Sequence, residues 1–128
     1  MSWQPAAESL IERLTGPAVT AADLADCLQL TSAVLAALTR KASGADGLLL
    51  DAAVWDIDAA RAHLHDQPRA WWAGAAAPLE PDHPAASHAL ALCRRLLSAA
   101  VTAMDDAEDV AARQAVSSAD RYLAQIAG

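Results

Sequence analysis

The sequence predicts an all-α protein: one domain folded as an up-and-down bundle of four to five helices. Hydrophobic residues make up 55% of the 128 positions, yet aromatic residues make up only 4%, so the apolar content rests on alanine and leucine, which favour helix over strand. Apolar residues recur at helical spacing, and no stretch shows sustained period-2 alternation. The length fits a single domain, spanning residues 1–128.

A first short helix is expected over residues 3–14, where Pro5 suits the first turn. Its apolar positions recur at helical spacing: Leu10, Ile11 and Leu14. The tripeptide at 15–17 ends it. Thr20 with Asp23 resembles a capping box and opens a second helix of about six turns.

The second helix is expected to end at Ser43-Gly44, and its buried face comprises Leu24, Cys27, Leu28, Thr31, Val34, Leu35 and Leu38. A third helix follows from about Asp46 to His65, and its buried side comprises Leu49, Leu50, Ala53, Ile57, Ala60 and Leu64. Because the connection between these two helices is so short, we expect them to form an antiparallel hairpin.

A crossover containing prolines and tryptophans is predicted at about 66–84, the one long interruption between helical patterns. Trp71 and Trp72 lie within it, and large aromatic side chains in a loop are the usual anchors of an interface, to which Arg69 adds a charged contact. In the structural alternative, one of the two rings closes the open end of the bundle, with Trp55 and Trp3 as neighbours.

The pattern after the crossover favours one long helix, because a single apolar face stays in phase to the C-terminus without a glycine or proline. That face comprises Leu90, Cys93, Leu97, Val101, Met104, Ala111, Ala115, Ala119, Tyr122 and Ile126. The acidic run at 105–109 is the weak point, since Asp106 with Asp109 could cap a second helix of near-equal length.

Four polar residues are expected to point inward from these helices: Asp56, His63, Arg94 and, if the last helix is continuous, Glu108. They have two interpretations. They form structural ion pairs at helix edges, with Asp56 beside His63, or they line a pocket between helices, where bundles build ligand sites.

The sequence predicts no metal, cofactor or catalytic residue. The histidines are not paired three or four residues apart on one helix face, and no serine or cysteine lies in a recognisable nucleophile motif. Cys27 and Cys93 lie next to leucines in helical patterns, as small buried thiols do. An enzyme is therefore the less favoured class.

A formal net charge of −7 with scattered cations argues against a nucleic-acid partner. No apolar run is expected to reach the length of a membrane span, so we expect a cytoplasmic protein without a membrane partner.

The favoured function is a small binding or accessory protein that recognises a protein or peptide partner, including a second copy packed along the last helix. The alternative is a small-molecule-binding bundle or small enzyme, with a pocket at the Trp/His end near residues 55–94. The candidate binding residues are Arg69, Trp71, Trp72, Trp55, Asp56, His63, His83, Arg94 and Glu108.

Overall fold

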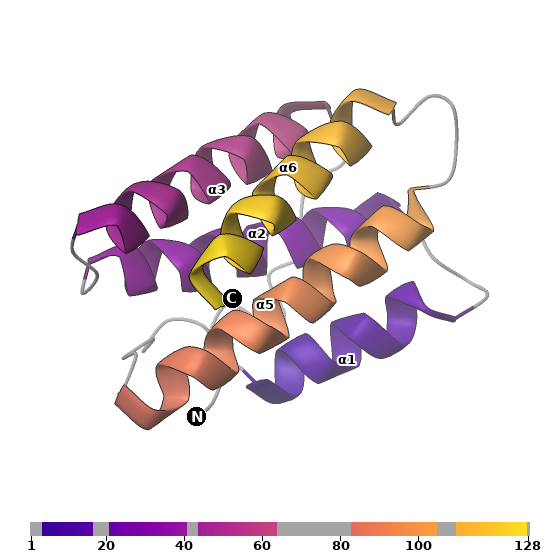
Figure 1. Ribbon diagram of the computed structural model, residues 1–128. Helices are drawn as coiled ribbons and strands as arrows, with labels where there is room; N and C mark the ends of the chain where they lie inside the picture. Colours follow the sequence, from indigo (N-terminus) through magenta and orange to yellow (C-terminus); the bar gives the residue numbers. More distant parts are fainter. Residues whose placement is uncertain (1–3, 17–20, 41–43, 64–82, 105–109, 128) are drawn as a thin grey trace.

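A computed structural model of the chain describes residues 4–16, 21–40, 44–63, 83–104 and 110–127. These residues form five α-helices and no strand (Figure 1), which confirms the predicted all-α bundle. The helices are α1 (Gln4–Leu14), α2 (Ala21–Thr39), α3 (Gly44–His63), α5 (His83–Ala103) and α6 (Val110–Ala127).

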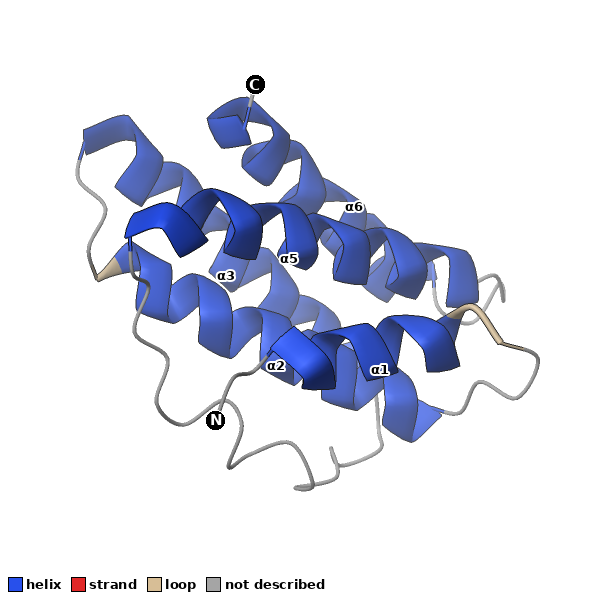
Figure 2. Cartoon of the chain, turned by 90° about the horizontal axis from the view of Figure 1, so that it is seen from below, coloured by secondary structure: helices blue, strands red, loops and turns tan. Residues whose placement is uncertain are grey.

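Four of the helices form a ring in which each packs against two neighbours. α3 contacts α2 and α6, and α5 contacts the same two helices from the other side. α1 lies outside this ring, against α5 and α2 (Figures 1 and 2). The described chain is therefore a four-helix bundle with one additional helix on its surface.

Neighbouring helices within the ring are antiparallel, and α3 and α5 run in the same direction (Figure 1). The last residue of α3 and the first residue of α5 consequently lie at opposite ends of the bundle. Residues 64–82 connect them. The crossover predicted at about 66–84 lies outside the described residues, except for His83 and Pro84, which begin α5.

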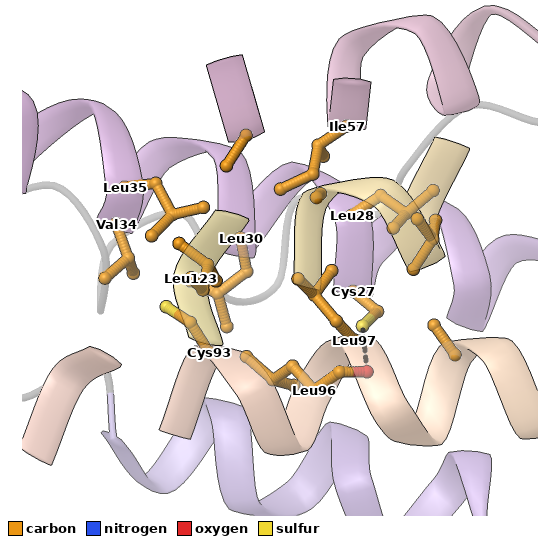
Figure 3. Packing of buried hydrophobic residues seen from close by; sticks show 14 of the residues in the cluster. Cys27, Leu28, Leu30, Val34, Leu35, Ile57, Cys93, Leu96, Leu97 and Leu123 are labelled. Carbon is orange, nitrogen blue, oxygen red and sulfur yellow. Dashed lines mark hydrogen bonds between the residues drawn. The ribbon is translucent and has the colours of Figure 1, made fainter. Parts of the chain in front are cut away.

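α2 supplies the centre of the core, because α1, α3 and α5 all pack against it. Every residue of its predicted buried face is buried. Figure 3 shows Leu28 and Leu30 of α2 among side chains that arrive from α3, α5 and α6, including Ile57, Leu97 and Leu123. The 3.6-residue periodicity of the sequence predicted this buried face correctly, although α2 ends at Thr39 and not at the predicted Ser43-Gly44.

α3 begins at Gly44, which was predicted to end the preceding helix. Gly44 has a φ of 65°, a left-handed conformation that glycine adopts without strain. The predicted core positions of α3 are buried, apart from the half-buried Leu49 and from Leu64, which lies outside the described residues: Leu50, Ala53, Ile57 and Ala60.

The prediction of one long helix over 84–126 is wrong. α5 ends at Ala103, α6 begins at Val110, and the two pack against each other as an antiparallel pair. Since the reversal resets the helical phase, Ala111 is exposed although it was predicted to be buried. The fully buried face of α6 comprises Ala112, Val116, Ala119 and Leu123.

The expectation that no segment has the length of a membrane span also needs correction. One described helix, over Ala22–Thr39, is long and apolar enough by length and composition. In the bundle 67% of this window is buried against other helices, which is the environment of a core helix.

The two faces of α3 should respond differently to truncation. Ile57→Ala removes a fully buried side chain and is expected to lower the free energy of unfolding by about 2–5 kcal/mol. Leu48→Ala, on the outer side of the same helix where Leu48 is 73% exposed, should change it by no more than about 0.5 kcal/mol. Urea denaturation of both variants measures this contrast, and equal losses would contradict the described orientation of α3.

Candidate functional site

Two large apolar side chains on α3 point into solvent. Trp55 is 79% exposed and Leu48 is 73% exposed, and the third exposed large hydrophobic residue of the described chain, Val110 on α6, is less accessible at 48%. Trp55 and Leu48 are seven residues apart, which places them about 20° from each other around the helix. They therefore share one side of α3, the side opposite Ile57.

Alanines extend this side along the whole helix. Ala45, Ala59 and Ala62 are exposed and Ala52 is half-buried. We call the resulting set the outer stripe: Ala45, Leu48, Ala52, Trp55, Ala59 and Ala62. Its successive spacings alternate between three and four residues, which is the heptad spacing of a helix that packs along another helix. α3 thus has one apolar face in the core and a second in solvent.

Aspartates border the outer stripe. Asp51 and Asp58 are exposed along one edge, and Asp56 lies at the other edge. Asp58 accepts hydrogen bonds from Ser32 Oγ at 3.1 Å and from Arg61 Nη1 at 3.3 Å. Arg61 also donates to Gln29 Oε1 at 3.2 Å, so the cation at this edge is engaged in holding α3 against α2.

Asp56 is half-buried, as its predicted position at the edge of the core face implies. Its Oδ2 atom is buried and has no hydrogen-bond partner among the described residues. The backbone of His63 belongs to α3, but its side chain is outside the described part of the structure. The Asp56–His63 pair therefore stays a prediction.

Arg94 is engaged in an ion pair between helices. Its Nε atom donates to Asp120 Oδ1 at 3.1 Å, with both side chains partly exposed, and so joins α5 to α6. Arg95 on the next position pairs with Glu8 of α1 at 3.1 Å. Both contacts join neighbouring helices. The Arg94 contact corresponds to the interpretation of this residue as a member of a structural ion pair.

Buried acids in α2 were missed as inward-pointing residues. Asp26 is fully buried and Asp23 is 4% exposed. Asp23 lies 3.8 Å from Arg13 of α1, and both aspartates have partners. The sequence did not indicate that these aspartates are buried, because a polar residue in a helix usually marks its solvent side. In α2 that side is covered as well, since the helix has neighbours on three sides.

The two thiols are buried and unreactive in character. Cys27 Sγ donates a hydrogen bond to the Leu96 carbonyl oxygen at 3.4 Å (Figure 3). Burial raises the pKa of the Cys27 thiol to about 12, and burial likewise raises the pKa of Cys93. Neither residue is a thiolate near neutral pH, so neither is a nucleophile there.

The described part of the structure does not place the other predicted site residues beside Trp55. Arg69, Trp71, Trp72 and Glu108 lie outside the described residues, and so does the side chain of His83. Trp55 faces solvent from α3, whereas Arg94 pairs on the α5–α6 side of the ring. Within the described ranges, no group of three His, Cys, Asp or Glu residues could hold a metal ion.

Comparisons with models of protein families, with curated proteins and with solved structures find no match for this chain.

Asp56→Ala is expected to keep or raise the stability of the protein. Oδ2 of Asp56 has no partner among the described residues, and a buried acceptor left without one costs about 1–3 kcal/mol. Alanine is also the better helix former. Asp51→Ala, at an exposed position of the same helix, is the control for helix propensity alone. Thermal and urea denaturation should show Asp56→Ala at least as stable as that control. A loss of about 1 kcal/mol or more would instead reveal a native partner for Asp56.

The native protein should resist alkylation by iodoacetamide at pH 8. Burial and the raised pKa values keep Cys27 and Cys93 as inaccessible thiols, so modification should follow global unfolding and accelerate in urea. Mass spectrometry of the time course gives the rate. Modification of the folded protein at the rate of a free cysteine peptide would contradict this burial.

Proposed function

We propose that this protein is a small helical binding protein, and that the outer stripe of α3 is the surface that recognises a protein or peptide partner. The observation that carries the proposal is the exposure of Trp55 and Leu48 on the side of α3 opposite its core face. Neither side chain contributes to the core, so the fold does not account for their presence.

Energetic considerations support an interface at this position. Burying a large apolar side chain contributes about 1.5–3 kcal/mol, and tryptophan is among the residues most enriched at binding hot spots. Trp55 lies near the middle of the outer stripe, where a partner would exclude water from it most completely. An aligned set of exposed apolar residues of this kind is typical of an interaction surface.

The spacing of the outer stripe favours a helical partner. Alternation of three and four residues aligns six positions along one side of the helix over about 26 Å. A partner helix can follow such a line throughout its length, with large side chains inserted beside the alanines. This is a helix-to-helix mode of recognition, and it requires no pocket.

The negative charge of the chain and the aspartates beside the stripe favour a protein partner over nucleic acid. We place the protein in the cytoplasm, with α2 as a core helix. The alternative of a small-molecule site at the Trp/His end depends on residues outside the described part of the chain.

Peptides selected from a displayed library of helical sequences for binding to the parent protein should depend on the outer stripe. Trp55→Ala should weaken their binding by about 2 kcal/mol or more, with a smaller loss for Leu48→Ala. Val110→Ala removes another exposed apolar side chain from a different helix and should leave affinity unchanged. Fluorescence anisotropy with labelled peptide measures the affinities.

Thermal denaturation of the three variants serves as the control for folding. Peptides that bind the parent protein and Trp55→Ala equally well would contradict the proposed binding surface.

A further inference from the structure

We infer that the outer stripe binds a basic amphipathic helix of a different protein, one whose apolar face is flanked by lysine or arginine. This inference rests on the proposed function and specifies the chemistry of its partner. Two observations support the inference: the charges beside the outer stripe and the sizes of the residues within it.

The rim of the outer stripe is acidic on both sides. In heptad terms the stripe occupies positions a and d, Asp51 and Asp58 occupy g, and Asp56 occupies e. Asp58 is ion-paired with Arg61 at 3.3 Å, whereas Asp51 is exposed and has no partner among the described residues, so Asp51 carries the unpaired negative charge of this edge. Arg61 also donates to Gln29 and is the one arginine of α3. Residues at e and g select the charge of a helical partner, so this rim selects cations.

A second copy of this chain would meet that rim with like charge. In an antiparallel pair of α3 helices, position g faces g of the other helix, which brings Asp51 near Asp58 of the second copy on both sides of the two-fold axis. In a parallel pair, g faces e, which brings Asp51 near Asp56. Both arrangements place Asp51 beside an aspartate of the second copy, and the one arginine of α3 is already bonded to Asp58 and Gln29, so Asp51 meets no unpaired cation there and association is disfavoured.

The sizes along the stripe define the shape of the partner. Small residues at Ala52 and Ala59 leave room for large apolar side chains of the opposing helix, whereas Trp55 and Leu48 require small residues opposite them. The partner is therefore an amphipathic helix with an alternating large and small apolar face and with basic flanks. Alanine-rich contacts also bring the two helices close together, which strengthens the interaction between their flanking charges.

A displayed library of helical peptides about three heptads long tests this inference. Positions a and d vary among apolar residues, and positions e and g vary among Lys, Gln and Glu. Selection against the parent protein is expected to enrich Lys over Glu at e and g about tenfold, and the binders should weaken as salt is raised. Asp51→Lys should weaken Lys-flanked peptides about threefold or more and strengthen their Glu-flanked counterparts.

Asp46→Lys is the matched control, since it makes the same charge change on α3 at an exposed position outside the rim, and it should have a smaller effect. Equal recovery of Lys and Glu in peptides that still require Trp55 would overturn the basic-helix inference and leave the binding surface in place. Binding that does not require Trp55 would overturn both. A dimer that light scattering detects in the parent but not in Trp55→Ala would identify a second copy as the occupant and also overturn the inference.

Discussion

The burial of α2 on three sides is the constraint on which the rest of the bundle depends. A helix with neighbours on three sides has few positions at which a polar side chain reaches water. Most positions of α2 are accordingly leucine, alanine or valine. Its polar residues need partners. Asp23 lies near Arg13 of α1, and Ser32 donates to Asp58 of α3. The additional helix α1 thus shields one side of α2 from solvent and supplies Arg13 as a partner for Asp23.

α3 has a different position in the same arrangement, because it packs against α2 and α6 while its other side faces solvent. Its core face is complete with Leu50, Ala53, Ile57 and Ala60. The outer stripe therefore adds nothing to the core, and its hydrophobic surface is free to act in association. Exposure of a tryptophan in water brings no benefit to folding, and for this reason we propose different roles for the two faces of α3.

Periodicity predicted the bundle and the core face of α2, since its leucines recur with a regular helical period. It failed over residues 84–126, where alanines continue an apolar phase from α5 into α6 and no glycine or proline marks the reversal. The outer stripe was missed for a related reason. Alanine fits either side of α3, so only Trp55 was identified, and it was assigned to the Trp/His end of the bundle. The chain alone does not say which of two apolar faces its neighbours will cover.

Acrylamide quenching of Trp55 fluorescence tests the outer stripe directly, in a variant in which Trp3, Trp71 and Trp72 are replaced by phenylalanine. Trp55 is then the only tryptophan. We expect acrylamide to quench Trp55 in the free protein as readily as an exposed indole, and a selected helical peptide to shield it at saturation. Shielding of Trp55 in the free monomer would contradict its exposure on α3, and unchanged quenching in the saturated complex would contradict its role in binding.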